Sequence, residues 1–156
     1  MRTGVLVCAA LIFTGTLTGA ADEPAKEWEN LQGKWKVVVK DGKADYPWDY
    51  IAKNGWFVIA KEKATLVIRE GKEELKLAEF AVKIDASKSP KVVTLTVEYI
   101  APEGEKAKQK GKKLVGVYSI DGDTVRIMLG EEKNPPKSFP VKGDEGVTTL
   151  KREKKK

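Results

Sequence analysis

Histidine is absent from this 156-residue chain, and its single cysteine, Cys8, lies in an apolar segment near the N-terminus. Catalytic arrangements built on Ser-His-Asp or Cys-His are therefore excluded, and so are zinc sites that use either side chain. No disulfide can form within the chain, so its stability must come from a packed core. Enzymes built on paired carboxylates, lysine or tyrosine are not excluded, and neither is a calcium or magnesium site made of oxygen ligands.

Long hydrophobic runs are also lacking, apart from one short run that begins the chain. Arg2 precedes the apolar residues Val5–Leu17, and the small residues 18–21 follow, which is the order of an export signal and its cleavage site. The run is shorter than the roughly 20 residues that span a bilayer, so we expect no transmembrane segment. Cys8 lies inside the run, behind the bulky Val7, rather than at its end, so we expect no lipid anchor there.

These features predict a signal peptide over residues 1–21 and a single domain over residues 22–156. A domain of about 135 residues is long enough to bury roughly two-thirds of its unfolded surface. We therefore expect an exported protein of the periplasm, the cell envelope or the medium, present as a monomer.

Arginine is scarce, because the formal net charge of +6 comes almost entirely from lysine. Proteins that read nucleic acids favour arginine and interleave it with stacking aromatics, a pattern that is missing here, so we expect no nucleic-acid partner. The lysine-rich runs at residues 103–113 and 151–156 are typical of a solvated loop and a frayed terminus. The alternative is attraction to an anionic polymer of the envelope or to lipid headgroups.

The rest of the chain is a series of short apolar stretches with turn residues between them. This pattern predicts eight strands. They cover residues 34–40, 56–60, 64–70, 75–84, 92–100, 113–120, 124–129 and 147–152. Short helical segments are expected over residues 24–31 and 47–54. Asp121-Gly122 between two apolar strands is a strong hairpin signal, and all seven prolines lie outside the proposed strands.

The predicted sheet is antiparallel, because no segment is long enough to connect parallel strands by a crossover helix. Eight such strands with one apolar face form either an up-and-down barrel or a two-sheet sandwich. Short hairpin connections favour the barrel, which also leaves no open edge. Gly33-Lys34-Trp35 at the start of the first strand resembles the Gly-x-Trp opening of lipocalins. The predicted fold is all-β, an eight-stranded antiparallel lipocalin-like up-and-down barrel with a short N-terminal helix.

Five motifs follow one another after the predicted signal peptide: 31–38, 85–91, 116–124, 135–139 and 150–152. In this order they resemble an uncharacterised secreted domain family of planctomycete bacteria. The resemblance covers essentially all of residues 22–156 and implies a lipocalin-like barrel of bacterial export origin. It implies no activity, because the function of that family is not established. Two ligand-related motifs are absent, the Thr-Asp-Tyr motif of lipocalins and the Arg-x-Tyr clamp of intracellular fatty-acid binders.

Two groups of residues are candidates for a site in such a barrel. Trp35 and Arg152 become neighbours when the first and last strands pair, and we predict that the guanidinium stacks on the indole at the barrel base. Trp35 is interpreted as a core plug, with contact to a ligand as the alternative. Tyr46, Trp48 and Tyr50 follow the first strand and are candidate ligand-binding residues at the barrel mouth. Trp48 and Ile51 are three residues apart, and we favour the structural interpretation in which they pack a short helix onto the barrel.

Carboxylate pairs give little support to an enzyme. Asp121 and Asp123 are interpreted as turn residues, since a calcium loop needs several more oxygens at fixed spacing. Glu79 and Glu98 interrupt apolar strands and are expected to point outward, away from any interior site. We therefore expect no catalysis, no metal and no cofactor.

Two functions remain open. The first is a binding module that holds a small apolar ligand inside the barrel, and the second is a structural or interaction protein of the envelope with a filled barrel. The interior volume discriminates between them. Large and small residues are both expected inside: Trp35, Trp56, Phe80, Tyr99 and Tyr118 among the large, and Ala60, Ala78 and Gly116 among the small.

Overall fold

The computed structural model describes residues 22–38, 48–101 and 108–154. The predicted signal peptide and the candidate mouth residue Tyr46 lie outside the described residues. Within the described residues, no helix has both the length and the apolar character needed to cross a membrane.

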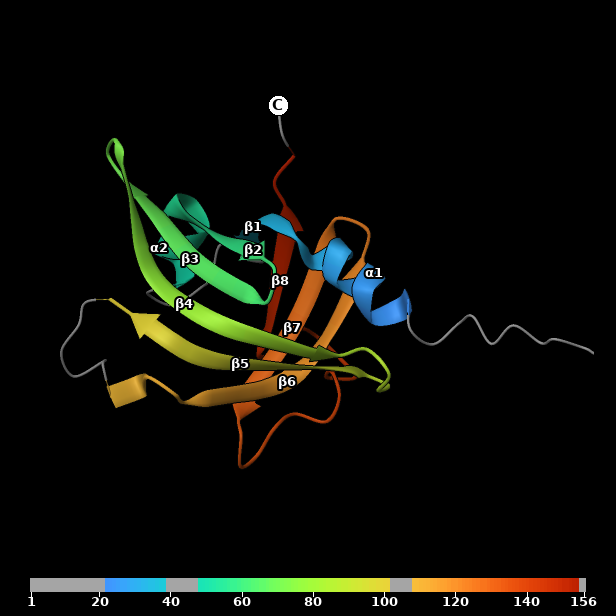
Figure 1. Cartoon of the computed structure of the whole chain (residues 1–156). Coiled ribbons are helices and arrows are strands. Elements are labelled where there is room, and N and C mark those ends of the chain that lie inside the picture. Colours follow the sequence, from blue (N-terminus) through green and yellow to red (C-terminus); the bar gives the residue numbers. More distant parts are fainter. Residues whose placement is uncertain (1–21, 39–47, 102–107, 155–156) are drawn as a thin grey trace, which may run out of the picture.

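Two helices and eight strands make up the described fold (Figure 1). The helices are α1 (Asp22–Leu31) and α2 (Trp48–Asn54). The strands are β1 (Gly33–Val38), β2 (Gly55–Ala60), β3 (Lys63–Glu70), β4 (Glu73–Asp85), β5 (Lys91–Ile100), β6 (Lys113–Asp121), β7 (Thr124–Glu131) and β8 (Val147–Arg152). All eight predicted strands are present, and the last has the predicted bounds.

Each strand pairs antiparallel with the next along the chain, and β8 pairs with β1 to close the barrel. The predicted eight-stranded antiparallel barrel is therefore confirmed. The Asp121-Gly122 hairpin between β6 and β7 is also present, and Gly122 has the positive φ of 54° that such a tight turn requires.

The barrel interior is apolar because side chains alternate along each strand and those on one face point inward. Trp35 and Val37 point inward from β1, and the register places Trp35 opposite Phe57 of β2. The buried core continues through Ala64 and Leu66 of β3. The same face carries Val82, Val93, Tyr118, Val125 and Leu150 on the later strands.

The prediction was wrong for two residues of β2. Trp56 and Ala60 were expected inside, but the pairing of Trp35 with Phe57 turns them to the outer face. Residues 56–59 are all apolar, so they carry no alternation from which the inward face could be read. Trp56 is nevertheless only 4% exposed, because other side chains cover it from outside.

The prediction was also wrong for Tyr99 of β5. The register between β4 and β5 shifts at this point, with Glu79 opposite Tyr99 and Phe80 opposite Val97. Glu98 is thus the extra residue of a β-bulge, and the residues after it exchange faces. Tyr99 therefore points outward, where the ammonium of Lys76 lies 4.8 Å from its ring centroid.

The two helices lie at opposite ends of the barrel (Figure 1). Helix α1 ends where β1 begins, whereas α2 lies between the end of β1 and the start of β2. One junction thus precedes β1 and the other follows it, so the two junctions are at opposite ends of that strand. The base of the barrel is defined here as the α1 end, and the mouth as the α2 end.

Candidate binding site in the barrel

Trp35 closes the base of the barrel. Its side chain is fully buried, and its indole N–H donates a 2.8 Å hydrogen bond to the carbonyl of Leu31, the last residue of α1. The guanidinium of Arg152 lies over the ring, with 4.2 Å between its central carbon and the ring centroid. The predicted stacking of Arg152 on Trp35 is therefore confirmed.

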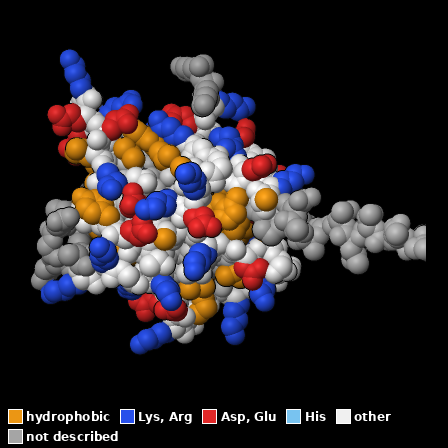
Figure 2. All heavy atoms as spheres, in the orientation of Figure 1, with side chains coloured by type: hydrophobic (Ala, Val, Ile, Leu, Met, Phe, Trp, Pro, Cys, Tyr) orange, Lys and Arg blue, Asp and Glu red, His pale blue; other side chains and the backbone are white. Residues whose placement is uncertain are grey.

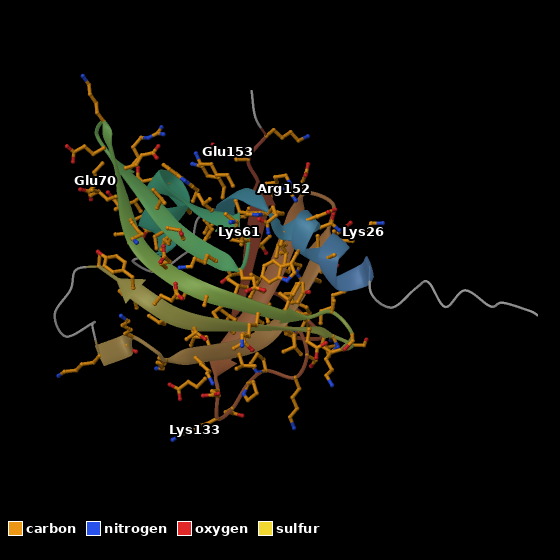
Figure 3. The ribbon with its side chains drawn as sticks, in the orientation of Figure 1. Lys26, Lys61, Glu70, Lys133, Arg152 and Glu153 are labelled. Atoms are coloured by element: carbon orange, nitrogen blue, oxygen red, sulfur yellow. The ribbon has the colours of Figure 1, made fainter. Side chains whose placement is uncertain are left out.

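Arg152 also caps the C-terminal end of α1. Its two terminal nitrogens donate hydrogen bonds of 2.6 Å to the backbone carbonyls of Gln32 and Asn30, and Nε lies 3.2 Å from a carboxylate oxygen of Asp123. Figure 3 shows this side chain between β8 and the end of α1. The last carbonyls of a helix lack partners within the helix, so Arg152 satisfies them and holds α1 over the base.

The backbone conformation of Gly33 explains why the Gly-x-Trp motif begins with glycine. Its φ is +127°, a conformation that side chains with a Cβ rarely adopt. A Cβ at this position would lie 2.9 Å from the guanidinium of Arg152. Glycine is therefore needed both for the turn out of α1 and for the approach of Arg152 to Trp35.

The interior holds a cavity of about 90 Å³. It lies along the apolar face of the strands, with almost no polar surface exposed to it. Its wall includes Leu31 at the base and Phe57, Phe80, Val93, Leu95 and Leu129 along the barrel. Side chains thus fill most of the interior, and the space left is smaller than the engineered cavity of roughly 150 Å³ that binds benzene.

Among the described residues that line the cavity, only Tyr118 and Thr148 have a polar side-chain group. Tyr118 is 2% exposed, and its hydroxyl has no hydrogen-bond partner among the described residues. Burial raises the pKa of Tyr118 well above its ordinary value, and the negative charge of Glu27 raises it further. The hydroxyl is therefore a neutral donor at any physiological pH.

Glu27 of α1 is a buried carboxylate at the base. The ammonium of Lys91, at the start of β5, lies 2.7 Å from one of its oxygens. Because Lys91 is directly opposite Tyr118 in the sheet register, the ion pair and the phenol lie at the same end of the barrel. Pairing is the condition under which a carboxylate is tolerated at such a site.

The candidate mouth residues are only partly described. Trp48 begins α2, but its side chain lies outside the described residues, as does Tyr46 altogether. Tyr50 is 36% exposed and donates a 3.3 Å hydrogen bond to a carboxylate oxygen of Glu70 at the end of β3. It does not line the cavity, whereas Ile51, the next residue of α2, is a buried member of the core.

The acidic pairs considered from the sequence lie on the outer surface. Glu79 and Glu98 both pair with the ammonium of Lys63, at 3.5 and 2.9 Å, so a cation separates them. Asp123 holds Arg152 as well as forming the turn, a role that its position in an Asp-Gly-Asp turn did not reveal. Within the described residues, no three acidic, cysteine or histidine side chains are grouped as a metal would require.

No protein-family model matches the chain, and no curated protein matches it. The class of protein is therefore defined by its fold and its site: a closed eight-stranded antiparallel barrel with a tryptophan-plugged base and a small apolar cavity.

Proposed function

We propose that this protein is an exported, non-catalytic binding module whose barrel takes a small apolar group. The closed base, the helix at the base and the Gly-x-Trp motif support a lipocalin-like identity for the barrel. The motif order supports membership of the secreted planctomycete family, and export agrees with the apolar segment that begins the chain. No cofactor enters this proposal.

The observation that carries the proposal is the cavity of about 90 Å³ with an apolar wall. An apolar cavity of this kind stays dry, because water would lack the two to four polar partners that it needs. Its size limits the bound group to a small hydrocarbon or the end of a chain that enters from the mouth.

The smallness of the same cavity favours the second candidate, a structural or interaction protein of the envelope with a filled barrel. Trp35, Phe57, Phe80 and Tyr118 all contribute rings to the interior. In this alternative the outer surface and the loops carry the function, and the cavity is an ordinary packing defect.

Xenon, applied under pressure to the isotope-labelled protein, separates the two candidates, because a single xenon atom fits a cavity of about 90 Å³ and engineered apolar cavities bind it. We expect saturable shifts in the amide spectrum at residues lining the cavity, with a Kd near 1 mM, about −4 kcal/mol. Val93→Ile places an additional methylene in the cavity and should weaken binding, whereas Val93→Ala should strengthen it. Val92→Ile is the matched control, because Val92 lies next in the chain but on the outer face.

Shifts that never saturate, or that Val92→Ile and Val93→Ile change equally, would place xenon outside the cavity. The binding module would then be rejected in favour of the filled barrel. Thermal melting of each variant keeps altered binding separate from altered folding.

A further inference from the structure

The outer wall formed by β1, β2 and β3 carries a cluster of cations around Trp56. The ammonium of Lys34 lies 3.8 Å from the ring centroid, and the guanidinium carbon of Arg69 lies 5.2 Å from it. The ammonium of Lys36 is 6.0 Å away. Three cations thus share one indole, and their stems leave Trp56 only 4% exposed.

The nearby acids of the described chain pair with only two of these three cations. Lys34 pairs with Glu153 at 2.9 Å and Arg69 with Glu74 at 2.9 Å, but within the described residues no carboxylate pairs with Lys36. The register places Lys36 directly opposite Lys151 of β8. Like charges in directly opposite positions destabilise a sheet, so folding alone gives no reason for this arrangement.

A surface hollow of about 240 Å³ lies beside the cluster. Lys53 and Asn54 at the end of α2 line it together with Lys36, Arg69, Trp56 and Gly71. Within the described residues, no carboxylate lines the hollow, and neither Lys53 nor Lys36 has an acidic partner. Three cations and one amide donor therefore converge on a concave site.

The positive surface continues beyond the hollow. Lys34 also lines a groove at the barrel base, together with Glu153 and Lys154. The pKa of Glu153 is lowered first by its hydrogen bond with Lys34 and further by the charges of Lys36 and Arg69. Lys34 links the two sites, because it lines the groove and also lies over Trp56 beside the hollow. The groove and the hollow together are called the basic strip, with cations at Lys154, Lys34, Lys36, Arg69 and Lys53. Such an elongated arrangement suits a linear polyanion better than a single small ion.

We propose that this strip binds the sulfate or carboxylate groups of an acidic polysaccharide, with Lys36, Lys53 and Arg69 holding one such group in the hollow. Nucleic acid fits less well, because Trp56 is buried beneath the cations and gives no face for base stacking. A lipid surface also fits less well. The exposed large hydrophobic side chains of the described residues are Tyr50, Leu75, Leu129 and Val141, and none lines the hollow or the groove.

The hollow shares no lining residue with the barrel cavity, so a test of one site does not test the other. Figure 2 shows basic and acidic side chains interspersed over the face that it presents. Lys83 and Lys133 belong to the outer surface away from the hollow, and Figure 3 shows Lys133 at the far end of the molecule from Arg152. Their removal changes the net charge without touching the hollow.

The test is calorimetric titration with a sulfated heparin octasaccharide at 0.15 M salt. We expect Lys36→Gln with Lys53→Gln to weaken binding at least tenfold, about 1.4 kcal/mol. Lys83→Gln with Lys133→Gln, which removes the same charge, should leave the affinity within about twofold. The protein with Lys36→Gln and Lys53→Gln is called the hollow variant. The indole N–H signal of Trp56 should shift when the octasaccharide is added to the unaltered protein, and it should not shift in the hollow variant.

Equal weakening by both pairs of substitutions would reduce the effect to net charge and overturn the proposal. No binding by the unaltered protein would also overturn it. Tighter binding to vesicles of anionic phospholipid or to single-stranded DNA, lost in the hollow variant, would assign the strip to that partner instead. If the double variant does not fold, Lys53→Gln alone serves, because Lys53 is exposed at the end of α2.

Discussion

Removal of Trp35 tests the base of the barrel directly. Trp35→Ala empties a fully buried aromatic site and should lower the free energy of unfolding by about 3–5 kcal/mol. That range already includes the indole hydrogen bond to Leu31, whose loss leaves a carbonyl unsatisfied. Far-UV circular dichroism in urea is the appropriate assay, since three other tryptophans would complicate fluorescence.

The stacking contribution is isolated by a double-mutant cycle. Arg152→Gln removes two short hydrogen bonds to backbone carbonyls, and because its side chain is 27% exposed we expect a cost of about 2–3 kcal/mol. Combined with Trp35→Leu, which keeps the site partly filled, the coupling energy should be about 0.5–2 kcal/mol. Additivity of the two substitutions would show that the stacked geometry contributes nothing. Unchanged stability of Trp35→Ala would remove Trp35 from the core.

Two further predictions concern a buried phenol and the N-terminus. Tyr118 has a raised pKa in the folded state, so its contribution to stability is complete below the ordinary tyrosine pKa near 10 and is lost as the pH rises above it. Tyr118→Phe should flatten the alkaline fall in stability measured by urea unfolding, and a fall that persists would place its cause elsewhere. Cleavage of the signal peptide should leave a mature N-terminus between Ala20 and Glu23. Intact-mass measurement of the exported protein would show this, and an uncleaved chain or a lipid on Cys8 would contradict it.

The strand positions were predictable because alternation and turn residues are local signals. The pairing of Trp35 with Arg152 was predictable for a different reason: in a barrel of consecutive hairpins, only the first and last strands remain to close the sheet. Both inferences need the order of the strands and no knowledge of side-chain contacts.

It was less predictable from the sequence whether an individual side chain points into the barrel or out of it. Trp56 follows a helix, so the alternation of β1 does not carry over to β2, and the register that decides its side is a long-range property. Tyr99 follows a β-bulge at Glu98, and no feature of the sequence indicated that bulge. The basic hollow combines side chains from β1, α2 and β3, and its cations are unremarkable in each segment taken separately.

The two misassigned rings explain how the barrel keeps a cavity and a charged wall at once. With Trp56 and Tyr99 inside, little of the present cavity would remain, since each ring would occupy space along its strand. On the outside they instead attract the ammonium groups of Lys34 and Lys76, at 3.8 and 4.8 Å. Substitutions in the cavity should therefore leave polysaccharide binding unchanged, and substitutions in the hollow should leave xenon binding unchanged. β2 and β3 each contribute residues to both sites, Phe57 and Ala64 to the cavity and Trp56 and Arg69 to the hollow, so any coupling between the sites is expected through these strands.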